Sequence, residues 1–260
     1  MTAAASEIKS CCAAAYATAA ARFLLGDSFH PGGSELTSRL IRRLRVGRGA
    51  TVVDVASGLG TSALQLALEL GCEVVGIELS PTNVAAGAEA AAEAGLTERV
   101  RFVAADAEAL PLDDAAMDAG LCECAFCTFP DKKAAAAELA RVLRPGARLL
   151  LADMVAEPER LPSELRSLAT WVACVGDARP LPELSGLLAE AGFLIEQVER
   201  HDTALAALLD RVDARLRAAA LLGGFLDAGI EDGRALVRAA REALTAGTLG
   251  YASILARRAP

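Results

Sequence analysis

Short apolar, β-branched runs alternate with longer runs of helical spacing between residues 50 and 153. This alternation predicts an α/β fold, a parallel sheet with helices on both faces. The expected strands are 51–55, 73–77, 100–104, 117–121 and 148–152. The expected helices are 61–70, 81–94 and 131–143, with Ser80 capping the second and a turn at 144–146 before the last strand.

The pattern loosens after residue 153. We expect a loop with two prolines, a helix through Trp171, a helix over 181–191, a strand over 193–198, a helical stretch over 203–245 and a closing strand over 250–256. The resulting division is an N-terminal helical segment, residues 1–44, that covers the ligand site, an α/β core, residues 45–200 and 247–260, and an inserted helical lid, residues 201–246.

Composition narrows the possible partners. A formal net charge of -8 argues against nucleic acid and favours a small-molecule substrate. The sequence contains no stretch of about 20 uninterrupted apolar residues, so we expect no membrane-spanning helix. Seven cysteines, with no recognisable export signal, predict a cytoplasmic protein with free thiols and a thiol reductant as a partner. The sequence does not indicate an oligomeric state.

A glycine-containing turn follows the first expected strand. Asp54-Val55-Ala56-Ser57-Gly58-Leu59-Gly60 leads into a helix, where glycines let a ligand approach the backbone. Glu78 ends the second strand, where its carboxylate can accept hydrogen bonds from ribose hydroxyls. Asp106 follows the third strand, where it can accept a hydrogen bond from an adenine amine. The turn alone fits a dinucleotide as well, so NAD remains open at this point.

Four ordered motifs together resemble the class I S-adenosylmethionine-dependent methyltransferases. They are Val53 to Gly60, Val75 to Ser80, Ala105 to Pro111 and Ala140 to Gly146. The resemblance implies a Rossmann-like fold and S-adenosylmethionine as cofactor, with Asp54 at its amino-acid end, Glu78 on the ribose and Asp106 on the adenine. The remaining residues expected at the cofactor are Ser57, Gly58, Gly60, Leu79, Ala107 and Cys122.

Several cysteines suggest a particular methyl acceptor. The stretch from Cys122 to Lys132, together with Cys174, resembles the arsenite methyltransferases. That resemblance implies Cys124 and Cys174 as catalytic residues, thiolate ligands of arsenic(III), with the pair Cys11 and Cys12 as possible further ligands. Thiolates suit this soft centre. The chain departs from that family at Asp27, which stands where a further cysteine is expected.

Other interpretations remain open. The acceptor could be a carbon, oxygen or nitrogen atom of a small apolar metabolite, with the cysteines only packing, or the chain could sense metalloids without turnover. Buried packing is the expectation for Cys72. His30 is a possible base but is expected to hydrogen-bond within a loop, Tyr16 and Trp171 are expected to pack, and His201 is expected at the surface.

Overall fold

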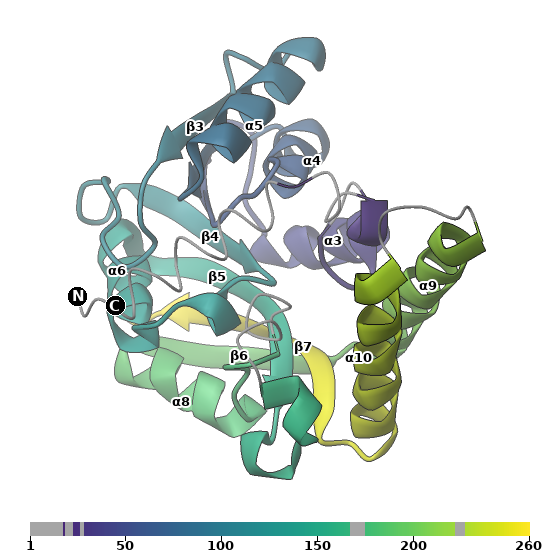
Figure 1. The fold of residues 1–260 in the computed structure, drawn as a ribbon. Coiled ribbons are helices and arrows are strands. Elements are labelled where there is room, and N and C mark those ends of the chain that lie inside the picture. Colours follow the sequence, from purple (N-terminus) through teal and green to yellow (C-terminus); the bar gives the residue numbers. More distant parts are fainter. Residues whose placement is uncertain (1–17, 19–22, 27–28, 167–174, 222–226) are drawn as a thin grey trace.

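One seven-stranded sheet, in the order β3-β2-β1-β4-β5-β7-β6, organises the protein. This computed structural model describes residues 18, 23–26, 29–166, 175–221 and 227–260 (Figure 1). The strands are β1 (Thr51–Val55), β2 (Glu73–Glu78), β3 (Val100–Ala104), β4 (Met117–Glu123), β5 (Leu143–Ala156), β6 (Phe193–Arg200) and β7 (Leu249–Arg258). Pairing from β3 across to β5 is parallel, whereas β7 runs antiparallel to both of its neighbours.

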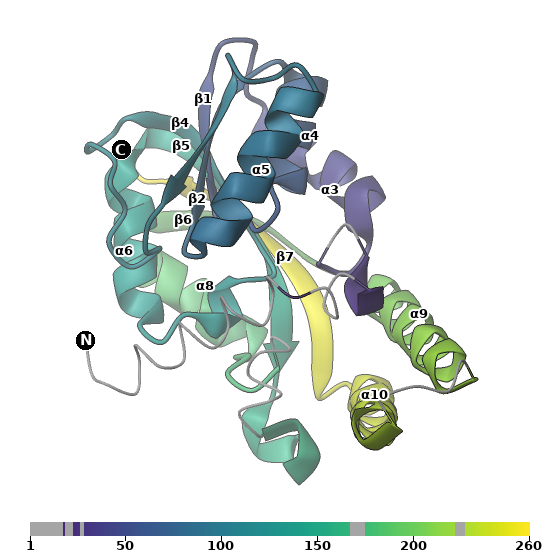
Figure 2. The ribbon, with the colours of Figure 1, turned by 45° about the horizontal axis from the view of Figure 1, so that its top comes forward.

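Helices cover both faces of this sheet (Figures 1 and 2). One face carries α3 (Gly33–Ile41), α4 (Thr61–Leu70) and α5 (Pro81–Glu93), and the other carries α6 (Lys132–Val142) and α8 (Leu181–Glu190). A pair of long helices, α9 (Asp202–Leu221) and α10 (Asp227–Thr245), connects β6 to β7. The described residues also contain four short 3₁₀ turns: η1 (Arg42–Leu44), η2 (Phe126–Thr128), η3 (Pro158–Arg160) and η4 (Ser163–Arg166).

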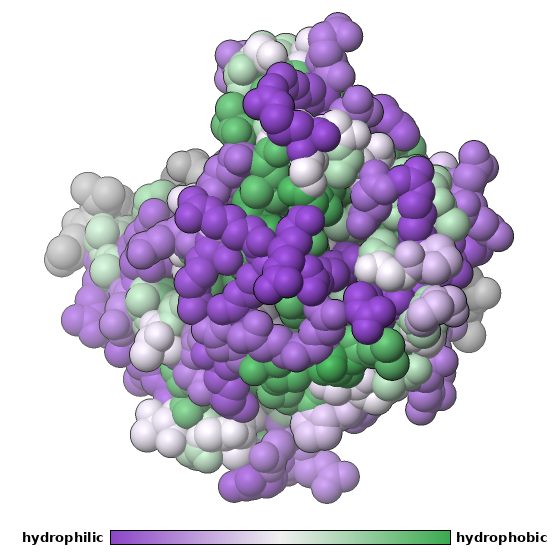
Figure 3. Space-filling view, turned by 180° about the vertical axis from the view of Figure 1, so that it is seen from behind, coloured by the Kyte–Doolittle hydropathy of each residue, from purple (hydrophilic) through white to green (hydrophobic). Residues whose placement is uncertain are grey.

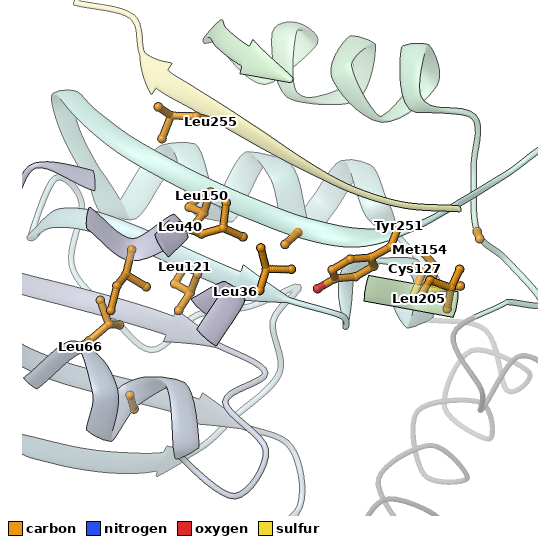
Figure 4. Close-up of a cluster of buried hydrophobic side chains, with 14 of the residues drawn as sticks. Leu36, Leu40, Leu66, Leu121, Cys127, Leu150, Met154, Leu205, Tyr251 and Leu255 are labelled. Atoms are coloured by element: carbon orange, nitrogen blue, oxygen red, sulfur yellow. The ribbon is translucent and has the colours of Figure 1, made fainter. Parts of the chain in front are cut away.

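Alternating side chains along the strands build the two cores. Val52 faces the α3–α4 side while Val53 faces the α6–α8 side, because successive side chains of a strand point to opposite faces. Leu121 and Leu150, on neighbouring strands, pack beside Leu40 of α3 (Figure 4). Continuous apolar strands of this kind are typical of sheets buried on both faces.

Most of the expected elements are present with small shifts of their ends. The Ser80 hydroxyl caps α5 by accepting a hydrogen bond from the Asn83 backbone N–H at 3.4 Å, as predicted. The predicted turn at 144–146 lies instead within β5, at a shift of register with β4: Met117 pairs with Leu143, but Ala119 already pairs with Arg148. Of the predicted helix through Trp171, only η4 lies within the described residues.

The prediction that His201 lies at the surface is wrong. Its ring is buried with 4% exposure, and Arg39 Nη2 lies 3.2 Å from Nδ1 while Ser253 Oγ lies 2.8 Å from Nε2. Because arginine can only donate, Nδ1 accepts and Nε2–H donates to Ser253. Burial lowers the pKa of His201, so the neutral ring joins β7 to α3.

Helices α9 and α10 lie between β6 and β7, and ion pairs join them: Arg241 to Asp210 at 2.7 Å, and Arg234 to Asp213 at 3.6 Å. No described helix is both long and apolar enough to cross a membrane. Hydrophilic residues cover much of the face seen from behind, with hydrophobic residues between them (Figure 3).

The core predicts a clear difference between two leucines. Leu150→Ala should lower the free energy of unfolding by about 2–5 kcal/mol, because Leu150 is fully buried and its removal leaves a cavity. Leu68→Ala, at a position with 64% exposure, should change it by less than about 0.5 kcal/mol. Urea unfolding of both variants measures this, and equal losses would contradict the assignment of the core.

Candidate functional site: an acidic cleft at the strand ends

A cleft opens at the carboxyl ends of β1, β2 and β4, and we call it the strand-end cleft. It lies where the strand order reverses between β1 and β4, the place where open parallel sheets bind ligands. Its volume is about 1060 Å³ when the space open to solvent is counted. Its wall includes eight of the predicted site residues: Asp54, Ser57, Gly58, Glu78, Leu79, Asp106, Ala107 and Cys124.

The turn between β1 and α4 forms the floor of the cleft. Ala56 and Gly58 have positive φ angles of 58° and 55°, and Gly60, with a φ of 81°, precedes α4. A Cβ on Gly60 would lie 2.4 Å from Cζ of Phe102, so this position also needs glycine for space. Gly60 therefore shapes the turn, although it is not among the residues that line the cleft.

A hydrogen bond to Glu78 joins this turn to the end of β2. Glu78 Oε2 accepts the Gly58 backbone N–H at 3.0 Å, and Oε1 accepts the Ser80 N–H at 2.9 Å. Across the cleft, Asp106 accepts the backbone N–H of Glu108 at 3.0 Å. Both carboxylates therefore stand on the cleft wall, where sequence analysis expects the ribose and adenine contacts.

Asp54 lies deep in the cleft wall beside two other acids. Burial raises the pKa of the Asp54 carboxyl well above its usual value, and the charges of Glu123 and Glu78 raise it further. A backbone hydrogen bond from Ala63 in α4 opposes this increase. No described lining residue is a lysine or an arginine, so a cation from a ligand would relieve the repulsion.

Three buried polar atoms on the cleft wall have no hydrogen-bond partner in the structure: Asp54 Oδ2, Ser57 Oγ and Asn83 Oδ1. Unpaired buried polar atoms are uncommon in folded proteins because each costs free energy. All three residues line the strand-end cleft, so a ligand rich in hydrogen-bonding groups and carrying positive charge fits it. An adenosyl sulfonium compound with an amino-acid end has these properties.

Glu123 is a cleft residue that the sequence analysis missed. It ends β4, and its carboxylate accepts hydrogen bonds from Ser62 Oγ at 2.7 Å and from Thr37 Oγ1 at 3.1 Å. His30 Nε2 lies 3.8 Å from Glu123 Oε2 and 3.4 Å from Thr37 Oγ1. Because these partners come from separate segments, sequence spacing gave no signal for the cluster.

The buried ring of His30 both lines the cleft and hydrogen-bonds locally, with Nδ1 3.3 Å from the Pro31 carbonyl. Its expected place within a hydrogen-bonded loop is therefore confirmed. Together, His30 and Glu123 form a polar pair on the cleft wall, where β4 ends.

The cysteines take different positions. Cys124 lines the cleft and has a φ of 52°, unusual for a residue other than glycine, while its N–H donates to the Ala152 carbonyl at 2.7 Å. Cys122 is fully buried in the α6–α8 core and does not line the cleft, and burial raises the pKa of its thiol. Cys72 is buried, as predicted.

The predicted residues that lie outside the described part of the chain are Cys11, Cys12, Tyr16, Asp27, Trp171 and Cys174.

Comparison with known proteins agrees with the fold. Residues 53–151 match the profile of a family described as "Methyltransferase domain". The methyltransferase GfsG of Streptomyces halstedii is 36% identical over 129 residues, which cover 50% of this chain and 46% of that protein. The 27-O-demethylrifamycin SV methyltransferase of Amycolatopsis mediterranei is 34% identical over 170 residues, covering 64% of this chain and 62% of that protein. The chain spans about half the length of the first curated relatives it matches.

Solved structures extend the likeness over most of the chain. A putative sarcosine dimethylglycine methyltransferase from Galdieria sulphuraria has a TM-score of 0.79 and 20% identity, covering 87% of this chain and 85% of that one. The [4+2]-cyclase SpnF has a TM-score of 0.72 and 27% identity, covering 86% of this chain and 80% of that one.

The charge cluster predicts how stability depends on pH. The folded protein holds a proton on Asp54 at pH values where the unfolded carboxyl, with a pKa near 3.8, has lost it. The free energy of unfolding contributed by this group therefore falls as the pH rises above that value. Asp54→Asn removes the charge and should be more stable than the native chain at neutral pH, with the difference shrinking toward pH 4.

Chemical unfolding from pH 4 to 8 measures this effect, with the exposed Asp113→Asn as control. A difference between Asp54→Asn and the native chain that does not change with pH would contradict the described charge cluster.

Residues 53–151 thus match a methyltransferase-domain profile, and the chain has the Rossmann-like fold of class I methyltransferases, with the glycine turn and the acids gathered at its strand ends.

Proposed function

We propose that this protein transfers the methyl group of S-adenosylmethionine to an oxygen, carbon or nitrogen atom of a small apolar metabolite. The observation that carries the proposal is the set of three unpaired buried atoms on the wall of the acidic cleft. Their acceptor character, together with the neighbouring acids, suits a cofactor that bears an ammonium group and a sulfonium centre.

Each cofactor contact is a proposal about this chain's residues. Asp54 would bind the ammonium group, Glu78 the ribose hydroxyls and Asp106 the adenine amine, with Gly58 allowing close approach of the backbone. Ser57, Leu79 and Ala107 line the same wall. Gly60 would act by shaping the turn, and Cys122 by packing beneath it, since neither lines the cleft. When bound, the cofactor supplies an electrophilic methyl group.

The rest of the cleft suits an acceptor without negative charge. Phe29, Ala125 and Phe129 provide an apolar wall, and Glu123, which is not assigned to the cofactor, would repel an acceptor that carries a carboxylate or phosphate. The curated relatives include the O-methyltransferase cnsE of Penicillium expansum, 35% identical over 125 residues, which supports an organic acceptor.

Glu123 and His30 are the groups that would accept a proton from a hydroxyl or amine acceptor. Glu123→Gln keeps the shape of the side chain but removes its charge. We expect it to lower kcat by roughly 10²-fold or more, the usual range for losing general-base assistance, with a much smaller change in cofactor affinity. The exposed Glu93→Gln on α5 is the matched control.

The assay uses methyl-labelled S-adenosylmethionine and a panel of apolar alcohols, phenols and amines, with calorimetry for S-adenosylhomocysteine. An unchanged kcat in Glu123→Gln would remove the proposed base. Binding of NAD in place of S-adenosylhomocysteine would remove the proposed function.

Arsenic(III) is a second candidate acceptor, favoured by the place of Cys124 on the cleft wall in a left-handed conformation. Its proposed partner Cys174, and the possible ligands Cys11 and Cys12, lie outside the described residues. None of the relatives named above is described as acting on arsenic, so we place the organic acceptor first. A metalloid sensor that binds without turnover is the remaining alternative.

Cys124→Ser separates these candidates. If arsenite or methylarsenite is the acceptor, this change should abolish arsenic methylation in the presence of a thiol reductant, because a hydroxyl is a poor ligand for the soft metalloid. S-adenosylhomocysteine affinity should stay within about twofold of the native value. Arsenic turnover that persists in Cys124→Ser would exclude the thiol site, and arsenic binding without product would indicate the sensor. The cytoplasmic location and the thiol reductant remain predictions from the sequence.

A further inference from the structure

The inserted helices α9 and α10 contribute no residue to the described wall of the strand-end cleft. The sequence predicts that this insert, residues 201–246, is a lid over the site. The structure shows a different connection: α9 contacts the segment that precedes Phe29 and His30, and these two residues do line the cleft.

Arg215 of α9 makes this contact. Its Nη1 donates to the Leu24 carbonyl at 2.9 Å. A Cβ on Gly26 would lie 3.4 Å from Nη1 and 3.5 Å from Nη2 of Arg215, so the guanidinium lies against the backbone of Gly26. The φ of Gly26 is 89°, which favours glycine at this position.

Apolar packing supports the same contact. Leu24 packs against a small cluster formed by Leu216 of α9 with Ile230 and Val237 of α10. In both ribbon views the dark purple segment ahead of α3 lies close to this pair of helices (Figures 1 and 2). The α9–α10 pair therefore holds residues 24–26 with a charged hydrogen bond and an apolar contact.

The residues held by α9 and α10 are close in the chain to residues that line the cleft. Phe29 follows Gly26 by three residues, so its Cα stays within about 11 Å of the Cα of Gly26. The Phe29 ring lies over the turn: its Cδ2 is 3.9 Å from where a Cβ on Gly58 would stand. His30, next in the chain, is near Thr37 and Glu123.

We propose that Arg215 is a positioning residue for cofactor binding, through which the inserted α9–α10 pair keeps Phe29 over the Gly58 turn. The inference rests on the proposed function, because it assumes that the cofactor occupies the strand-end cleft. The insert then acts on the site through its contacts with Leu24 and Gly26, close in the chain to Phe29, and not as a wall of the cleft.

The test compares Arg215→Ala with Arg211→Ala. Arg211 is exposed on the same helix and makes no ion pair or side-chain hydrogen bond among the described residues. We expect Arg215→Ala to weaken S-adenosylhomocysteine binding roughly tenfold by calorimetry, since a hydrogen bond from a charged group is lost, and Arg211→Ala to leave it unchanged. Arg215→Lys can still donate to the Leu24 carbonyl and should restore part of the affinity.

A second readout needs no ligand. Hydrogen exchange of the peptide over residues 23–30 should be faster in Arg215→Ala than in Arg211→Ala, while peptides from β1 and β4 exchange as in the native chain. Native protein that fails to bind S-adenosylhomocysteine would overturn the proposed function, and exchange would then still test the contact itself. Affinity and exchange in Arg215→Ala that match those of Arg211→Ala would overturn the inference.

Discussion

Repulsion among buried carboxylates at the ends of β1, β2 and β4 is the constraint on which the site depends. Asp54 cannot move away from Glu78 and Glu123, because parallel pairing of β1 with β2 and β4 brings the three strand ends together. Hydrogen bonds from Gly58, Ser80, Ser62 and Thr37 satisfy Glu78 and Glu123, but they bring no charge from lysine or arginine. The fold thus retains an unfavourable interaction that a cationic ligand relieves, which is a common property of binding sites.

Space at this site is set by one aromatic ring. Phe102 of β3 fills the volume beneath the turn, and a Cβ on Gly60 or Gly76 would come within 2.4 Å of its ring. The turn can therefore adopt its tight path only with glycines around the ring. The shape of the turn depends on glycines and Phe102, whereas the charge of the cleft comes from the acids at the strand ends. Both affect the same proposed ligand site.

Sequence periodicity was sufficient for β1, β3 and α4, whose residues 51–55, 100–104 and 61–70 agree with the prediction. The two strands are rich in apolar, β-branched residues and the helix is bounded by glycines, so the sequence pattern there favours a single type of element. His201 and Glu123 show the limit. Each is a polar residue at a strand end, and its burial depends on partners distant in sequence, Ser253 for one and Thr37 for the other. The left-handed backbone of Cys124 had no local signal, since glycine is the usual residue there.

The central claim is that an adenosyl sulfonium cofactor satisfies the unpaired polar atoms on the wall of the strand-end cleft. A crystal structure with S-adenosylhomocysteine tests it most directly, because this product retains the amino-acid and adenosine groups. We predict that the ligand lies in the strand-end cleft and that Asp54 Oδ2, Ser57 Oγ and Asn83 Oδ1 gain hydrogen-bond partners from it or from water that it orders. A ligand bound elsewhere, with these three atoms still unpaired, would contradict the account.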